Sequence, residues 1–118
     1  RDGLDEISIG DKTEVAELKN GAVRRFSIQP EDYGVTRQDI AAIRVEDATE
    51  SLRTLRSVLA DHAGPARDIV QLNAGAAIYV AGLADSLESG IARADEVIAS
   101  GEALKRLEKL VVLSQSFD

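Results

Sequence analysis

The sequence lacks cysteine, methionine and tryptophan, and aromatic residues make up only 3% of its 118 residues. Without cysteine the chain has neither disulfide bonds nor thiolate metal sites. This is compatible with a cytoplasmic location, which we expect. The scarcity of aromatic side chains predicts a core of Leu, Ile, Val and Ala, which favours closely packed helices. The chain begins with Arg1 instead of methionine, and no signal-like segment follows. We therefore expect a piece of a longer protein.

Acidic residues outnumber basic residues by 21 to 14, which gives a formal net charge of −7. This excess argues against binding to the phosphate backbone of nucleic acids, because such binding depends on Lys and Arg. It does not exclude a phosphorylated small substrate, since a metal ion can supply local positive charge. No apolar run approaches the roughly 20 residues that cross a bilayer. We expect neither a nucleic-acid nor a membrane partner.

The first part of the chain is predicted to form a β-hairpin. Residues 14–28 read as two short strands around Asn20-Gly21, a pair that suits the positive φ angles of a type I′ turn. The apolar residues of the second strand alternate imperfectly, so we expect a bulge or a partly twisted edge. A turn region follows at 29–34, and the capping-box pattern at 36–39 predicts a short helical turn. A lone hairpin is marginal in water, so a larger sheet is expected beside it.

Four helices are predicted in the second part of the chain. A capping box at 47–50 opens the first, and the second spans 64–81, with a Gly-Pro start because proline suits the first helical position. Asp85 is expected to cap the third helix, and a Ser-Gly break separates it from the last, at 102–113.

The apolar spacing of these helices predicts which residues face a core. The second helix is apolar nearly all round, so it is expected to be central and buried. In the first helix the predicted inward residues are Ala48, Leu52, Leu55 and Leu59. In the third they are Leu87, Ile91, Ala94 and Ile98. In the last they are Leu104, Leu107 and Val111.

Two adjacent carboxylates, Asp5 and Glu6, lie in a turn at residues 3–8, near the start of the chain. Mg²⁺ prefers oxygen ligands and usually keeps several waters, so a turn with two acidic side chains can hold it. A solvated or capping pair is the more common case. The two residues alone leave both interpretations open.

Other polar residues have structural interpretations. Asn73 lies on an apolar helix, where a buried amide must find hydrogen-bond partners, so we favour structural anchoring, for which the backbone of a sheet is one candidate partner. The single histidine, His62, has no second ligand or nucleophile near it in the sequence. The stretch at 64–68 first of all starts a helix, and its Arg67 can reach an acidic neighbour. Lys12 either pairs with the two carboxylates or contacts a phosphate.

The order of these motifs resembles the C-terminal part of the anthranilate phosphoribosyltransferases. The resemblance covers essentially the whole chain, and the ordered set is far more specific than any one motif. It rests on Gly3-Leu4-Asp5-Glu6-Ile7-Ser8, Glu17-Leu18, Asn20-Gly21, Gly64-Pro65-Ala66-Arg67-Asp68-Ile69-Val70, Leu72-Asn73-Ala74, Ala76-Ala77-Ile78-Tyr79-Val80-Ala81-Gly82, Ser86-Leu87, Ile98-Ala99-Ser100-Gly101, Leu107 and Leu110-Val111.

The resemblance implies an α/β fold class. Residues 1–118 would be the C-terminal segment of a glycosyltransferase-type α/β domain, here a β-hairpin followed by about four helices, without the N-terminal helical domain and the phosphate-binding loop. The implied reaction transfers a phosphoribosyl group from phosphoribosyl pyrophosphate to anthranilate in tryptophan biosynthesis. Family members usually form homodimers. The alternatives are a pyrimidine nucleoside phosphorylase-like enzyme and a non-catalytic helical interaction module.

By the resemblance, Asp5 and Glu6 match the family's Asp-Glu pair, which binds Mg²⁺ associated with the pyrophosphate. Such an ion stabilises charge on the phosphate oxygens of the leaving group. The resemblance assigns no catalytic residue to this chain. The glycine-rich loop that cradles pyrophosphate, the Lys-His-Gly-Asn segment and the arginine that helps bind anthranilate are all missing. The segment alone is therefore expected to bind Mg²⁺ weakly, to require the missing N-terminal polypeptide, and to be inactive.

Overall fold

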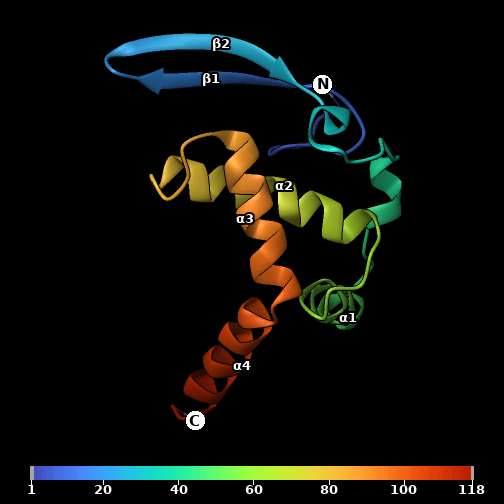
Figure 1. Cartoon of the computed structure of the whole chain (residues 1–118). Coiled ribbons are helices and arrows are strands. Elements are labelled where there is room, and N and C mark those ends of the chain that lie inside the picture. The colour runs from blue at the N-terminus through green and yellow to red at the C-terminus, as the bar shows by residue number, and fades with distance from the viewer. Residues whose placement is uncertain (1, 118) are drawn as a thin grey trace. The chain divides into compact units, whose positions relative to one another are not determined.

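The structure is a computed structural model that describes residues 2–117, which form a β-hairpin, two short 3₁₀-helices and four α-helices (Figure 1). The chain divides into two compact units, the first ending at Arg44 and the second beginning at Val45. The predicted hairpin followed by four helices is confirmed. In the part of the chain that the structure describes, no helix is both long enough and apolar enough to cross a membrane.

The hairpin belongs to the first unit. Strand β1 (Thr13–Lys19) pairs antiparallel with β2 (Ala22–Ile28) across a two-residue turn. Asn20 and Gly21 have φ angles of 52° and 77°, as a type I′ turn requires. The pairing continues without interruption along all seven residues of each strand, so the predicted bulge is wrong.

Two 3₁₀-helices complete the first unit, η1 (Pro30–Tyr33) and η2 (Ile40–Ile43). The helical turn predicted to open at 36–39 begins later, because Asp39 is its cap and accepts a hydrogen bond from the Ala41 N–H at 2.9 Å. The buried apolar side chains of this unit are Ile9, Ile28, Pro30 and Val35.

Helix α1 (Ala48–Leu59) starts as predicted, since the Asp47 carboxylate accepts a hydrogen bond from the Glu50 N–H at 2.7 Å. The predicted inward face is wrong for this helix. Leu52 and Leu55 are 49% and 42% exposed, and the buried residue is Val58.

The chain leaves α1 through a Schellman motif. Asp61 adopts a left-handed conformation with a φ of 66°. The His62 N–H donates to the Ser57 carbonyl at 3.1 Å, and the Asp61 N–H donates to the Val58 carbonyl at 3.0 Å. Carbonyls at the end of the helix are thereby satisfied, although the left-handed position is not occupied by glycine.

Helices α2 (Pro65–Val80) and α3 (Leu87–Ala99) pack closely against each other through two glycines (Figure 1). A Cβ atom at Gly75 would lie 2.4 Å from the Ile91 Cα, and one at Gly90 would lie 2.3 Å from the Gly75 carbonyl oxygen. The two backbones therefore touch, and no side chain separates them.

The core of the second unit lies around this crossing. Its buried apolar side chains are Val58, Leu72, Ile91, Ala94 and Ile98. The predicted inward face of α3 is therefore confirmed for three of its residues. Helix α2 packs on both α1 and α3, as a central helix should, but it is not buried all round, because Val80 is 83% exposed.

The start of α3 differs from the prediction by one residue. Its N-cap is Ser86, whose hydroxyl accepts a hydrogen bond from the Ser89 N–H at 3.0 Å, so the expected cap at Asp85 is wrong. Helix α4 (Glu102–Gln115) follows Gly101, and its residues Leu104, Leu107 and Val111 are half-buried.

Candidate metal-binding loop

The candidate site is the acidic loop, residues 3–7, which precedes β1 and carries Asp5 and Glu6. The backbone bends at both acidic residues, and both side chains are exposed to solvent. Gly3 enters the loop with a φ of 87°, a conformation that glycine adopts without steric cost. The loop therefore presents two carboxylates where a hydrated cation has access.

Hydrogen bonds close the acidic loop at its base. Asp2 Oδ2 accepts from the Ser8 hydroxyl, and Asp2 Oδ1 accepts from the Leu4 N–H at 3.1 Å. The Ser8 oxygen also accepts from the Gly10 N–H at 2.9 Å. The hydrogen bond from Ser8 has the largest effect on the pKa of Asp2, and the bond from Leu4 the second largest. Both lower the pKa, because both stabilise the charged carboxylate.

The base of the loop is fixed to the rest of the first unit. The Ser8 N–H donates to Thr13 Oγ1, at the start of β1, over 3.2 Å. The next residue, Ile9, is 0% exposed, and its carbonyl accepts from the Gln38 N–H at 2.9 Å. The chain on the C-terminal side of the loop is thus held by both side-chain and backbone contacts.

The donor set at Asp5 and Glu6 suits part of a Mg²⁺ site. Mg²⁺ takes one or two carboxylates and completes an octahedral shell with water and substrate phosphate oxygens. Within residues 2–117, no three His, Cys, Asp or Glu side chains are grouped so that they could hold a metal ion. Two carboxylates that leave most positions open match a site whose remaining ligands come from a substrate and water.

Arg67, which is far from the acidic loop in the sequence, connects the helices of the second unit. Its guanidinium donates to Asp95 on α3 at 2.7 Å, to Asp61 after α1 at 2.8 Å, and to Gln71 on α2 at 3.0 Å. These contacts raise the pKa of Arg67, and the hydrogen bond to Asp95 has the largest effect. The predicted acidic neighbour is confirmed, since the guanidinium joins α2 to α3 and to the end of α1.

Removing this guanidinium should destabilise the helical unit. We expect Arg67→Met to lower the free energy of unfolding by about 1–2 kcal/mol, because the side chain is only 11% exposed and loses hydrogen bonds to two half-exposed carboxylates. Urea unfolding followed by circular dichroism measures this. The matched control is Arg93→Met, which breaks an exposed pair with Glu96 and should cost less than about 0.5 kcal/mol. Equal losses in the two variants would contradict the assignment.

Asn73 and His62 also have local partners. The Asn73 Nδ2 donates to the Ile69 carbonyl one turn earlier in α2, at 3.0 Å. The amide is therefore anchored to its own helix, which agrees with a structural role. Its contact with the backbone of a sheet stays a prediction. The exposed His62 has its Nδ1 3.2 Å from the Ser57 hydroxyl, at the end of α1.

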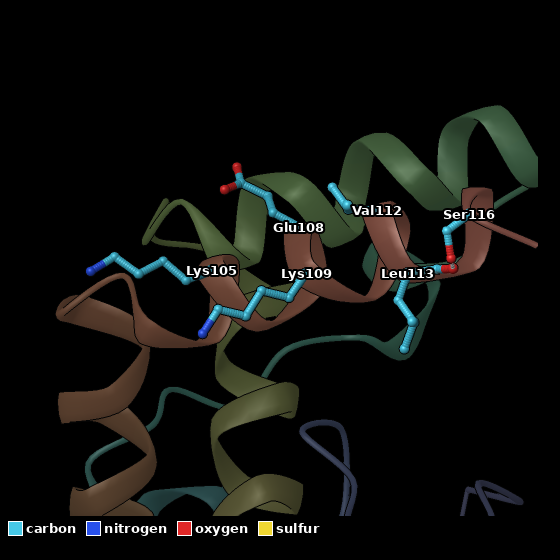
Figure 2. Close-up of a pocket in the computed structure, with 6 residues that line it drawn as sticks. All are labelled: Lys105, Glu108, Lys109, Val112, Leu113 and Ser116. Carbon is cyan, nitrogen blue, oxygen red and sulfur yellow. Dashed lines mark hydrogen bonds between the residues drawn. The ribbon is translucent and has the colours of Figure 1, made fainter.

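A hollow of about 550 Å³ lies along α4 (Figure 2). Figure 2 shows its lining side chains extending from one helix. These are Lys105, Glu108, Lys109, Val112, Leu113 and Ser116. Because the lining residues belong to α4 and to Ser116, which directly follows it, the hollow is an open surface feature and resembles no enclosed substrate site.

Comparison with known proteins identifies the class of protein. Residues 1–104 match the glycosyl transferase family, a/b domain, and the chain belongs to this family. Among its relatives is the anthranilate phosphoribosyltransferase of Acidovorax sp. (strain JS42). That protein is 56% identical over 115 residues, which are 98% of this chain and 33% of the relative.

Solved structures give the same result. Anthranilate phosphoribosyltransferase from Thermus thermophilus superimposes with a TM-score of 0.84 and 37% identity, over 93% of this chain and 32% of that chain. A variant of the Saccharomyces cerevisiae enzyme with Mg bound has a TM-score of 0.77 and 27% identity, over 90% of this chain and 31% of that chain. The chain thus spans about a third of the length of the curated relatives it matches.

These comparisons confirm the α/β fold class and the resemblance to anthranilate phosphoribosyltransferases. The relatives carry the name of the transferase, which favours that interpretation over the nucleoside phosphorylase-like alternative. They also agree with an enzyme segment more than with a non-catalytic helical module, because the similarity includes both the hairpin and the helices.

Proposed function

We propose that residues 1–118 are the C-terminal segment of the α/β domain of an anthranilate phosphoribosyltransferase. The intact enzyme transfers a phosphoribosyl group from phosphoribosyl pyrophosphate to anthranilate, with release of pyrophosphate, in tryptophan biosynthesis. The single observation that carries this proposal is the 56% identity to the Acidovorax enzyme over 98% of this chain. The homodimeric state implied by the resemblance and the cytoplasmic location expected from the sequence belong to the same proposal.

In this proposal Asp5 and Glu6 hold Mg²⁺ through their carboxylate oxygens. Support comes from their exposure, their adjacency at a backbone bend, and the Mg in the similar yeast structure. When bound, the ion supplies positive charge to phosphate oxygens as pyrophosphate leaves. The chain itself contributes two anionic ligands on a loop that is exposed to solvent.

The remaining polypeptide of the intact enzyme would supply the N-terminal helical domain and the phosphate-binding loop. Exposed apolar side chains in the second unit support this division, because large apolar patches on proteins usually mark surfaces that other polypeptide covers. The most exposed of them, all above half, are Val80, Leu83, Leu110, Val112, Leu113 and Phe117.

The test is whether activity depends on preceding polypeptide. We expect the 118-residue chain alone to be inactive with phosphoribosyl pyrophosphate, anthranilate and Mg²⁺. Activity should appear when the chain replaces the matching third of the Acidovorax relative, giving a protein that we call the joined polypeptide. Consumption of anthranilate, followed by its fluorescence, measures the reaction, and the N-terminal part alone is the control. Turnover by the 118-residue chain alone, or a folded but inactive joined polypeptide, would contradict the proposal.

A further inference from the structure

We infer that Asp2 and Ser8 are positioning residues, which hold the acidic loop in the bent conformation that lets Asp5 and Glu6 bind one metal ion together. This inference rests on the proposed function, because it concerns the metal site proposed for those two carboxylates. It assigns a role to two residues that are not themselves metal ligands.

Consecutive carboxylates need a bent backbone to share an ion. On an extended chain, neighbouring side chains point to opposite faces, so Asp5 and Glu6 would diverge. The backbone bends at both residues in the structure. Residues 3–6 are all exposed, so the bend is not maintained by burial of the loop in a core. Hydrogen bonds made by the loop and by the residues at its two ends hold the bend instead.

The bond between Asp2 and Ser8 acts at those two ends. It joins the residue before the acidic loop to the residue after it. Ser8 is only 3% exposed and is itself fixed by Thr13 and Gly10, so it is the anchored end. Closing the loop in this way removes much of the conformational freedom of the residues between the two ends.

Asp2 is acidic, yet its contacts give it a positioning role. Both of its carboxylate oxygens already accept hydrogen bonds, one from Ser8 and the other from the Leu4 N–H. The second bond forms the turn at which the chain enters the acidic loop. Binding a cation through Asp2 would compete with both bonds, whereas the side chains of Asp5 and Glu6 are exposed to solvent.

The test compares Ser8→Val with Ser8→Thr in the 118-residue chain. Both variants add similar bulk at a buried position, but only threonine keeps the hydroxyl. Mg²⁺ is titrated into each protein while the backbone amide signals of residues 4–7 are followed by NMR, which detects weak binding. We expect Ser8→Val to weaken Mg²⁺ binding by about 10–100-fold and to speed hydrogen exchange in the acidic loop, and Ser8→Thr to restore both.

Further variants separate this inference from the proposed function. Asp2→Ala removes the partner of the hydroxyl and should weaken Mg²⁺ binding as Ser8→Val does; it decides the question if Ser8→Val does not fold. Ser86→Ala removes a serine cap in the helical unit and should leave Mg²⁺ binding unchanged.

Two results have different meanings. If Asp5→Asn abolishes Mg²⁺ binding while Ser8→Val and Asp2→Ala bind as the unsubstituted chain does, the positioning role is overturned and the metal site stands. If Mg²⁺ moves none of these signals in the unsubstituted chain, or if Asp5→Asn and Glu6→Gln bind normally, the metal site itself fails.

Discussion

Asp5→Asn and Glu6→Gln should each lower the rate of phosphoribosyl transfer by the joined polypeptide about 100-fold or more. Each change replaces an anionic oxygen ligand with a neutral amide of nearly the same shape, which binds a hard cation more weakly. The value of kcat/KM measured across a range of Mg²⁺ concentrations should fall, and the concentration needed for half-maximal rate should rise. Partial recovery at high Mg²⁺ would assign the loss to metal binding.

The control for this experiment is Glu108→Gln. It removes the same negative charge from an exposed side chain of α4 and should leave kcat/KM within about twofold of the unsubstituted enzyme, because surface charge alone has little effect. Normal turnover by Asp5→Asn and Glu6→Gln would remove both residues from the metal site. A comparable loss in all three variants would indicate a general effect of charge.

Gly75→Ala should destabilise the helical unit strongly, although alanine is the better helix former. A Cβ at this position would lie 2.4 Å from the Cα and 2.6 Å from the backbone nitrogen of Ile91, so the two helices must separate. Overpacking typically costs about 1–3 kcal/mol, and a clash with backbone atoms, which cannot move aside, lies at the upper end of this range. The gain in helix propensity is only about 1 kcal/mol. We expect a net loss of about 2 kcal/mol or more, measured by urea unfolding.

Ala77→Val is the matched control for the glycine substitution. It enlarges an exposed residue of the same helix and should change the free energy of unfolding by less than about 1 kcal/mol. A Gly75→Ala protein as stable as the unsubstituted chain would contradict the close crossing of α2 and α3. Gly75→Val, which adds two further methyl groups, should be more damaging still.

Features with a local cause could be predicted from the sequence. The turn at Asn20-Gly21 and the cap at Asp47 depend on a few neighbouring residues, and both are confirmed. The start of α3 was missed by one residue because Asp85 and Ser86 are both good N-caps. Only the backbone path, which brings the Ser89 N–H to the Ser86 hydroxyl, distinguishes them.

Packing could be predicted only in part from the sequence. Periodicity groups residues on one face of a helix but does not say what covers that face. For α3 the covering helix is α2, and Ile91 and Ile98 are buried as predicted. For α1, Leu52 and Leu55 share a face and yet are exposed. The paired glycines in α2 and α3 were a usable signal, since glycine inside a helix often marks a close approach.

The candidate site was only partly visible in the sequence. Asp5 and Glu6 stand out because they are adjacent and lie in a predicted turn. Asp2 and Ser8 do not, because their hydrogen bond joins residues six positions apart across an irregular loop. No helical or strand periodicity links such positions, so a bend in the backbone has to be known before the contact can be seen.

Asp61 shows two demands that conflict at one position. Its left-handed backbone would be relieved by glycine, by roughly 1 kcal/mol. Glycine, however, would take away the carboxylate that meets Arg67 at the start of the next helix. Aspartate therefore adds backbone strain after the end of α1, while its carboxylate links this end to the first turn of α2. An Asn at this position would relax the backbone and loosen that tie, so the identity of this residue governs how firmly two successive helices are coupled.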